Sequence, residues 1–348
     1  MAEAVMSDAR ERAEIQEQLR AHNIAVAQPT DPPLFTAAPV SSMQPYHWKA
    51  ADLARLLELI GGKLKLEAGG MRRTLRLANP GLPYGTTPTF WCSIQYIHPG
   101  EVATSHRHAA TALRFVMQGS GTETTVDGEL YMMRQGDLVL TPSWTWHDHE
   151  NVSPTPMVWL DVLDISLVRA LNATFFEPLD LPRQPVAQQS DRSFRQFGSG
   201  IMRPVDAKAT RLASPVLAYA WDRAVQALEA ASALEPDPYD DIILEYQNPL
   251  TGGSALPTIG TALQMLRPGV ETQAHRHTGS VVYYAVEGHG AMTIEDQTFA
   301  WGPGDFIALP PWARHAHANR SSTERAILFQ VNDLVVLKSL GLYREIPA

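Results

Sequence analysis

The sequence has 348 residues, 45% of them hydrophobic and 19% charged, which is typical of a soluble globular protein long enough for two domains. The net charge of −9 argues against nucleic acid as a partner, because binding to phosphates requires a basic surface. The single cysteine, Cys92, excludes an internal disulfide framework and thiolate zinc sites, and it fits a reducing compartment.

The first 70 residues are predicted to form an arm that carries two helices. A charged pattern indicates a helix over residues 8–21, and a second helix is expected over residues 50–60, after the proline-rich stretch QPTDPPLFTAAP. We expect the arm to pack on a partner subunit or on another domain. The N-terminus lacks the apolar core of a signal peptide, and no stretch approaches the length of about 20 apolar residues that a membrane span needs. We therefore expect a cytoplasmic protein with no membrane partner.

The rest of the chain contains an internal repeat. Residues 79–151 match residues 248–319 in their Asn-Pro, Pro-Gly, His-Arg-His, Gly-Asp and Trp positions, first at an offset of 169 residues and then at 168. The lost residue is expected in a hairpin turn between Gly290 and Gly304. Each copy contains short alternating runs bounded by Gly and Pro, which predict β-strands in a sandwich or small barrel.

This repeat divides the chain into four predicted parts. They are the arm over residues 1–70, a first β domain over 71–170, a linker over 171–247 and a second β domain over 248–348. The linker is rich in proline and polar residues, and one helix is expected within it, over residues 220–232.

Histidines recur at equivalent positions of the two copies. His106 and His108 are two positions apart in a predicted strand, so their imidazoles face the same side, and an antiparallel neighbour would bring His147 alongside. Three imidazoles leave three positions of an octahedral ion open for a bidentate ligand and dioxygen, and nitrogen ligands suit Fe(II) among other divalent metals. We predict a metal site at these three residues. The second copy offers a candidate second metal site at His275, His277 and His315.

The segments GEVATSHRH and GDLVLTPSWTWHDHEN resemble the two cupin motifs, and the doubled form resembles a bicupin. The glutamate usual in the first motif is replaced by Ala112 or Leu113 in one copy and by Val281 or Val282 in the other. This argues against a bicupin of the oxalate-decarboxylase kind. It favours a three-histidine site that keeps the full 2+ charge of the ion and attracts an anionic chelating ligand.

The chain is more closely similar to the gentisate 1,2-dioxygenase family, which includes salicylate, 5-nitrosalicylate and 1-hydroxy-2-naphthoate types. The similarity is carried by RRTLRLANPGL, PTFWCSIQY, HRHAATALRFVMQGSG, VDGE and MVWLDVLDI, within residues 72–165. It implies an all-β bicupin of two double-stranded β-helix (jelly-roll) barrels with a helical N-terminal arm and short linking helices. It also implies one Fe(II) per N-terminal cupin, ring cleavage of an aromatic hydroxy acid with O₂ between C1 and C2, and a homo-oligomer, either a dimer or a tetramer.

Two residues are expected to act on the substrate. Arg114 is six residues after His108, so it points inward, and an inward arginine needs an anionic partner such as the substrate carboxylate. The second copy has Tyr283 there, so we place catalysis in the first copy and expect the second to be silent. His149 could exchange the phenolic proton, or it could be a structural polar residue. His317 is its equivalent.

Four more positions match residues that the family places near the substrate: Arg72 at the mouth, and Trp91, Gln95 and Asp161 in the pocket. A solvated basic patch with Arg73 and Arg76 is an alternative for Arg72, a core position is an alternative for Trp91, and a structural role is an alternative for Asp161.

The ring substituents of the substrate stay open at this point. Thr74 and Trp91 stand where, by the resemblance, many gentisate-cleaving members have His and Tyr, which favours a substrate without the 5-hydroxyl or with a nitro or halogen substituent. Gentisate itself is an alternative. The sequence is also compatible with a non-catalytic bicupin that binds a small organic acid, and with a Mn- or Zn-dependent bicupin isomerase or decarboxylase.

Overall fold

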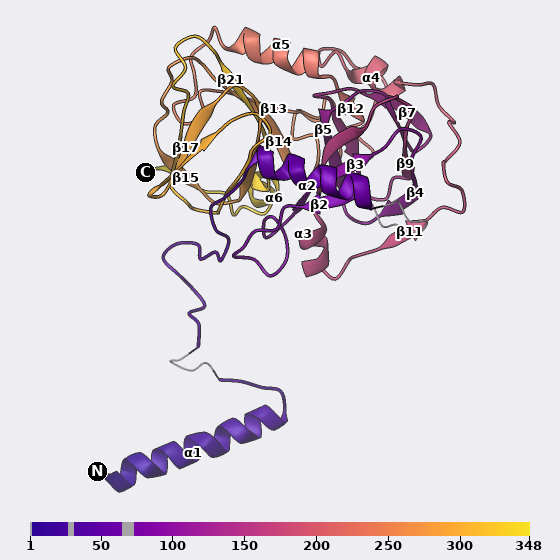
Figure 1. Ribbon diagram of the computed structural model, residues 1–348. Helices are drawn as coiled ribbons and strands as arrows, with labels where there is room; N and C mark the ends of the chain where they lie inside the picture. The colour runs from indigo at the N-terminus through magenta and orange to yellow at the C-terminus, as the bar shows by residue number, and fades with distance from the viewer. Residues whose placement is uncertain (1, 27–30, 65–72) are drawn as a thin grey trace. The chain divides into compact units, whose positions relative to one another are not determined.

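The computed structural model describes residues 2–26, 31–64 and 73–348, and the chain divides into two units, Met1–Val40 and Ser41–Ala348 (Figure 1). The first unit holds helix α1 (Ala2–Ala21), which begins earlier than the helix predicted over residues 8–21. Among the helices of the described ranges, none combines the length and the apolarity needed to cross a membrane.

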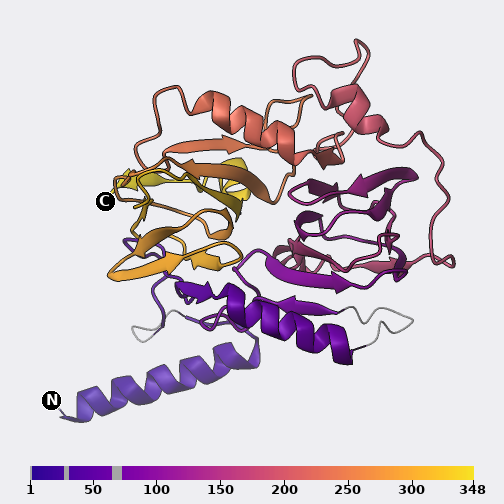
Figure 2. The ribbon, with the colours of Figure 1, turned by 45° about the horizontal axis from the view of Figure 1, so that its top comes forward.

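The second unit contains two β-barrels, which lie side by side in Figures 1 and 2. The strands of the first barrel are β2 (Thr74–Arg76), β3 (Trp91–Ile97), β4 (Val102–His108), β5 (Ala112–Gln118), β6 (Thr122–Val126), β7 (Glu129–Met133), β8 (Leu138–Thr141), β9 (His147–Asn151), β10 (Met157–Leu163), β11 (Phe176–Pro178) and β12 (Ala218–Tyr219). Those of the second are β1 (Tyr46–Trp48), β13 (Ile242–Glu245), β14 (Gly260–Leu266), β15 (His275–His277), β16 (Val281–Glu287), β17 (Gly290–Ile294), β18 (Gln297–Trp301), β19 (Phe306–Leu309), β20 (His315–Ala318), β21 (Ala326–Asn332) and β22 (Glu345–Pro347).

Each barrel consists of two antiparallel sheets. The orders are β12-β8-β5-β10-β3-β2 and β11-β4-β9-β6-β7 in the first barrel, and β1-β19-β16-β21-β14-β13 and β18-β17-β20-β15-β22 in the second. The helices of this unit are α2 (Ala50–Lys63), α3 (Ile165–Ala170), α4 (Arg192–Phe197), α5 (Trp221–Ala231) and α6 (Leu334–Ser339). The two-barrel β fold expected from the sequence is therefore confirmed, and the linker contains α4 in addition to the helix predicted over residues 220–232.

Both faces of the six-stranded sheets are buried along their central strands, which explains why these strands read as nearly continuous apolar runs. In β5, Val116 faces the interior of the first barrel, while Leu113 and Phe115 join a hydrophobic core that extends to the second barrel. Phe115 stacks on Phe329 of β21 with ring centroids 4.2 Å apart. The barrels therefore share one core between them, while each keeps its own interior.

The two repeats exchange their leading strands. Strand β1, which precedes the first barrel in the chain, pairs with β19 of the second, whereas β12, which precedes the second barrel, pairs with β8 of the first. The repeated Gly-Asp turn supports this exchange. Asp305 accepts the Ala50 N–H at the start of α2 (2.7 Å), and Asp137 accepts the Trp221 N–H at the start of α5 (3.0 Å). Each carboxylate thus stabilises the positive end of the helix that follows the exchanged strand.

A second reciprocal contact joins the barrels. Thr89 donates to Asp333 (2.7 Å), and its equivalent Thr258 donates to Asp164 (2.6 Å). Each barrel therefore contributes one donor and one acceptor to the junction.

The register corrects one expectation about the repeat. The β6–β7 and β17–β18 hairpins have turns of equal length, since Val126 pairs with Glu129 and Ile294 with Gln297. The lost residue lies instead in the connection before β17, which crosses from one sheet to the other.

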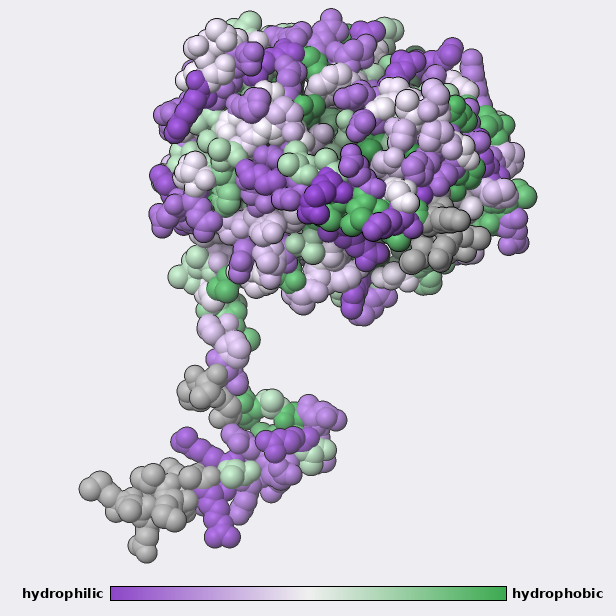
Figure 3. Space-filling view, viewed as in Figure 1, coloured by the Kyte–Doolittle hydropathy of each residue, from purple (hydrophilic) through white to green (hydrophobic). Residues whose placement is uncertain are grey.

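The face drawn in Figure 3 mixes hydrophilic and hydrophobic residues.

Candidate metal centre

Three histidines predicted as ligands meet inside the first barrel. His106 and His108 project from β4, and His106 lies directly opposite His147 of β9 in the antiparallel register. Their ligand nitrogens all lie within 4.8 Å of one another, and the His106 and His147 rings are 4.3 Å apart between centroids. The structure therefore brings together the three residues that sequence spacing had only suggested.

Backbone carbonyls fix the tautomer of all three rings. The Nδ1 atoms of His106, His108 and His147 lie 2.7, 2.7 and 3.0 Å from the carbonyl oxygens of Thr104, Ala110 and Thr145. A carbonyl only accepts, so each Nδ1 carries the proton and each Nε2 keeps its lone pair. Burial, and then the positive charge of Arg114, holds the pKa of His147 well below its ordinary value, so this imidazole is neutral. Three nitrogen donors that lie within 4.8 Å of one another form a site that fits a cation.

A cavity of about 770 Å³ opens in front of this triad. Its lining comes from both sheets of the barrel and from the segment after α3: Thr74, Arg76, Ser93, Gln95, His106, His108, Ala110, Arg114, Asp161, Leu163, Ile165, Thr174, Phe175 and Phe176. Five of these residues are apolar, and the other nine carry polar or charged groups that could fix the orientation of a small molecule.

Arg114 lies at the buried end of the cavity, and its side chain is only 2% exposed. The protein already supplies an anionic partner, because Arg114 Nε is 3.1 Å from Asp161 Oδ1 on the adjacent strand β10. The guanidinium also donates from Nη1 to the Thr141 hydroxyl. Asp161 thus holds Arg114 in place, and the further N–H groups of the guanidinium are the ones that a ligand could use.

Gln95 is the most informative polar residue of the cavity. Its side chain is buried, and neither its amide nitrogen nor its amide oxygen has a hydrogen-bond partner among the described residues. Buried amides are nearly always paired, so an unpaired one that lines a cavity indicates a bound ligand or water. Thr74 lies opposite Gln95 in the β2–β3 register.

Two other predicted residues lie near the cavity without lining it. Trp91 contacts Tyr84 edge-on at 5.1 Å between centroids, and the Arg76 guanidinium lies 5.9 Å from its ring. His149 is fully buried behind the triad, 6.0 Å from His147 between ring centroids, with its Nδ1 2.8 Å from the Thr124 hydroxyl.

Three neighbouring arginines were considered for the mouth of the site, and the structure describes two of them. Arg72 lies outside the described residues. Arg73 is buried, where it pairs with Glu101 and donates to the Leu64 carbonyl at 2.9 Å, so it stabilises the fold. Arg76 is exposed and lines the cavity. Sequence reasoning had treated Arg76 as a flanking residue, although its even spacing from Thr74 places both on one face of β2.

Sequence reasoning also missed Phe176. Strand β11 pairs with β4 beside the histidines, and the Phe176 ring stacks on His106 with centroids 5.1 Å apart. The short segment Phe-Glu-Pro carries no recognisable motif, so only the strand pairing reveals its position.

The second triad repeats the geometry of the first. The ligand nitrogens of His275, His277 and His315 also lie within 4.8 Å of one another, beside a cavity of about 510 Å³. Burial lowers the pKa of His277 to about 4, so this imidazole is neutral near pH 7. Tyr283 and Gln330, which face each other across β16 and β21, occupy the positions of Arg114 and Asp161.

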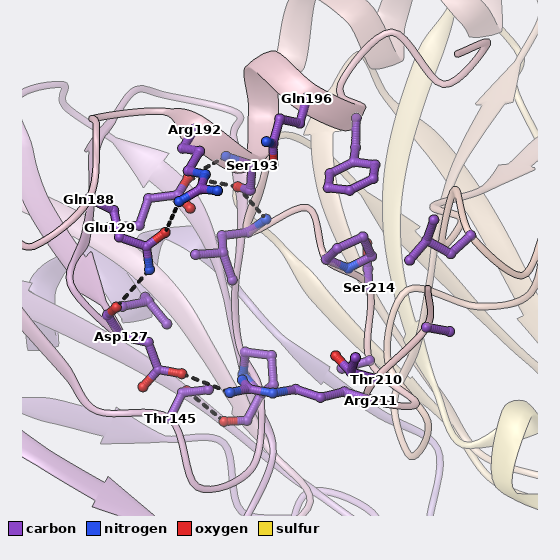
Figure 4. Close-up of a pocket in the computed structure, with 18 of the residues that line it drawn as sticks. Asp127, Glu129, Thr145, Gln188, Arg192, Ser193, Gln196, Thr210, Arg211 and Ser214 are labelled. Carbon is purple, nitrogen blue, oxygen red and sulfur yellow. Dashed lines mark hydrogen bonds and ion pairs between the residues drawn. The ribbon is translucent and has the colours of Figure 1, made fainter. Parts of the chain in front are cut away.

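A third cavity, of about 390 Å³, lies between the first barrel and the linker (Figure 4). Its polar groups bind one another. Arg211 pairs with Asp127 at 3.1 Å, and the Ser193 N–H and hydroxyl donate to Glu129 at 2.8 and 2.7 Å. We assign this cavity to packing of the linker on the barrel.

Comparison with known proteins gives one consistent result. A cupin-domain family profile matches residues 93–163 and 262–332. The chain is 39% identical to 5-aminosalicylate 1,2-dioxygenase of a Comamonas species (88% of this chain, 82% of that protein) and 37% identical to gentisate 1,2-dioxygenase 1 of Aquipseudomonas alcaligenes (97% and 96%). The crystal structure of salicylate 1,2-dioxygenase from Pseudaminobacter salicylatoxidans matches with a TM-score of 0.88 at 31% identity, over 96% of both chains.

Proposed function

Because the chain belongs to the gentisate 1,2-dioxygenase family of two-barrel cupin enzymes, we propose that it cleaves the ring of a 2-hydroxybenzoate between C1 and C2, with Fe(II) and O₂. The observation that carries this proposal is the meeting of three convergent imidazoles and the buried Arg114 at one cavity. His106, His108 and His147 would hold the ion. Fe(II) fits three nitrogen donors, and it would supply the redox chemistry by which O₂ reacts with the ring.

Two arginines would hold the acidic substrate. Arg76 at the rim attracts the anion, and Arg114 binds its carboxylate through N–H groups that Asp161 and Thr141 do not engage. The Arg114–Asp161 pair is neutral overall. An anionic substrate would therefore lower the net positive charge of the site, because its negative charge would lie next to the 2+ ion held by the triad.

Polar and apolar neighbours would complete the site. Gln95 offers its unpaired amide to the substrate or to oxygen, and Phe176 forms an apolar wall that excludes water from one side. His149 lies behind His147 and does not line the cavity, so of the two roles expected from the sequence we propose the structural one. Trp91 would act from outside the cavity by holding Arg76 over its ring.

We propose a substrate with no 5-hydroxyl or with another 5-substituent, since Thr74 is a small lining residue opposite Gln95. Two of the relatives' names, 5-aminosalicylate and salicylate, fall in this range, whereas gentisate carries the 5-hydroxyl and is the alternative substrate. A homo-oligomer and a cytoplasmic location stay predictions, which light scattering and cell fractionation would test.

An oxygen-electrode panel tests the proposal. Fe(II)-reconstituted protein would be given salicylate, gentisate, 5-aminosalicylate, 5-nitrosalicylate, chlorinated salicylates and 1-hydroxy-2-naphthoate. We expect O₂ uptake equal to the substrate consumed for at least one acid, and both atoms of ¹⁸O₂ in the ring-opened product. Iron-loaded protein that consumes no O₂ with any of these acids would instead favour a bicupin that only binds a small acid.

A further inference from the structure

The second barrel contains a complete donor set that ring cleavage in the first barrel does not use. The Nδ1 atoms of His275, His277 and His315 lie 2.8, 3.3 and 3.0 Å from the oxygens of Glu345, Thr278 and Ala313, and all of these oxygens accept. The Nε2 atoms therefore carry the lone pairs. Those of His275 and His315 are buried and have no hydrogen-bond partner among the described residues.

This arrangement carries an energetic cost that a bound cation would remove. The two imidazoles are at most 2% exposed, and their Nε2 lone pairs lie within 4.8 Å of each other and of the His277 donor. Leaving a buried acceptor unsatisfied costs about 1–3 kcal/mol. A divalent transition metal would satisfy all three nitrogens together.

The second triad differs from the first in one outer contact. Strand β22 pairs with β15 in the second barrel as β11 pairs with β4 in the first. Glu345, which lies opposite His277, therefore occupies the position that Phe176 occupies opposite His108. The Glu345 carboxylate accepts the His275 Nδ1–H at 2.8 Å, and Tyr239 stacks on the same ring, with an interplanar angle of 4°. A carboxylate behind a ligand histidine fixes the ring and increases its basicity.

The charge of the second cavity suits a cation and disfavours an aromatic acid. Its charged lining residues are Asp240, Glu245, Glu345 and Lys338, so carboxylates are in excess. Glu245 faces Ala262 across β13 and β14, as Arg76 faces Ser93 across β2 and β3. The rim charge is therefore reversed between the two barrels, and Tyr283 replaces Arg114 at the buried end.

We propose that His275, His277 and His315 form a second, non-catalytic centre for a divalent transition metal, and that this ion fixes the last strand of the chain through Glu345. Metal occupancy at this centre and order in β22 are then coupled, because Glu345 of β22 contacts the ligand His275 directly. The proposal does not depend on ring cleavage.

Metal content after anaerobic loading with Fe(II) tests the centre directly. We expect two ions per chain in the wild type and one in each of the variants His106→Ala/His108→Ala and His275→Ala/His277→Ala. One ion in the wild type and none in His106→Ala/His108→Ala would overturn the proposal. The wild-type value does not depend on the folding of any variant.

Co(II) absorption in the His106→Ala/His108→Ala background tests the role of Glu345. Adding Glu345→Gln should weaken Co(II) binding about 10- to 100-fold. Glu177→Gln is the matched control, because Glu177 is in β11 but pairs with Arg107, and it should leave the affinity unchanged. Equal affinities with and without Glu345→Gln would remove Glu345 from the centre.

Hydrogen exchange tests the coupling to the last strand. Co(II) should slow exchange in peptides covering residues 343–348 when Glu345 is present, and it should have little effect in the Glu345→Gln variant. Exchange that does not respond to Co(II) in the parent protein would refute the coupling.

Discussion

The two barrels keep the same metal-binding frame and surround it with opposite charge. In the first, the triad lies beside a cavity with Arg76 at the rim and the Arg114–Asp161 pair at its buried end. In the second, Glu245 and Tyr283 occupy the corresponding positions. The strand pairings are nearly identical, so the difference is in a few side chains that point into each cavity.

This comparison separates two requirements of the enzyme, the binding of a metal and the recognition of an acidic substrate. The His-Arg-His spacing and its antiparallel partner position three imidazoles, and this depends on backbone register alone. Recognition of an acidic substrate depends on inward residues of neighbouring strands, which can change without disturbing the register. A complete histidine triad therefore predicts a metal site but does not by itself predict an enzyme.

The largest effect should come from breaking one triad at a time. The His106→Ala/His108→Ala variant should lose O₂ uptake completely, because the ion and the substrate share this cavity. The His275→Ala/His277→Ala variant should lose one ion and thermal stability, with O₂ uptake per remaining ion maintained. Loss of uptake in both variants at intact folding, checked by circular dichroism, would mean that the barrels are not functionally distinct.

The next effect should come from giving the first barrel the side chains of the second. Arg114→Tyr/Asp161→Gln removes both members of the buried pair, so no uncompensated charge remains. We expect iron to be retained and kcat/KM to fall by about 100-fold or more, since losing a buried charge contact costs about 2–5 kcal/mol. The single variant Arg114→Gln should be less stable than the double variant, because it leaves Asp161 buried without its cation. Full activity in the double variant would remove Arg114 from substrate binding.

A smaller effect is expected at the rim. Arg76→Glu introduces the charge found at Glu245 and should raise KM about 3- to 10-fold with little change in kcat, because an exposed charge contributes about 1 kcal/mol. Steady-state kinetics at low and high salt would check this, and the difference from the wild type should shrink as salt screens the charge. A KM that does not change would assign Arg76 to packing against Trp91.

The last prediction concerns the junction between the barrels, where we expect an effect on stability and none on catalysis. Burial raises the pKa of Asp164 to about 6. The Asp164 carboxyl therefore binds a proton more tightly in the folded protein than in the unfolded chain. As a result, the free energy of unfolding falls as the pH rises from about 4 to 6. Relative to Asp164→Asn, the wild type should lose at most about 3 kcal/mol between pH 4 and pH 7. Denaturant unfolding at several pH values measures this, and a difference that does not vary with pH would contradict it.

Much of this molecule could be predicted from its sequence, because repeats and alternation report directly on backbone geometry. The 169-residue offset predicted two equivalent domains. Arg114 lines the cavity as predicted, but the reason given was wrong, because His108 ends β4 and Arg114 is in β5 of the other sheet, so the alternation does not continue between them. The His-Arg-His pattern placed both triads in strands, as the register shows.

Other features depend on pairings between distant segments that no local pattern records. Asp161 as the partner of Arg114, Phe176 over His106 and Glu345 behind His275 all arise from strands that meet across the barrel. The position of His149 behind the triad could not be predicted for a similar reason. Its spacing from His147 predicts which face of β9 carries the side chain, but not whether that part of the face lines the cavity or lies deeper in the barrel.

The exchange of β1 and β12 has an evolutionary consequence. An isolated half of the chain would leave a barrel edge, at β8 or β19, without its neighbouring strand, and would leave Asp137 or Asp305 without the helix that it stabilises. Two identical halves could supply these contacts to each other, since each half carries both the leading strand and the edge that receives it. The fused chain thus has the architecture of a strand-swapped homodimer, which is the arrangement expected if a duplicated gene was joined to its copy.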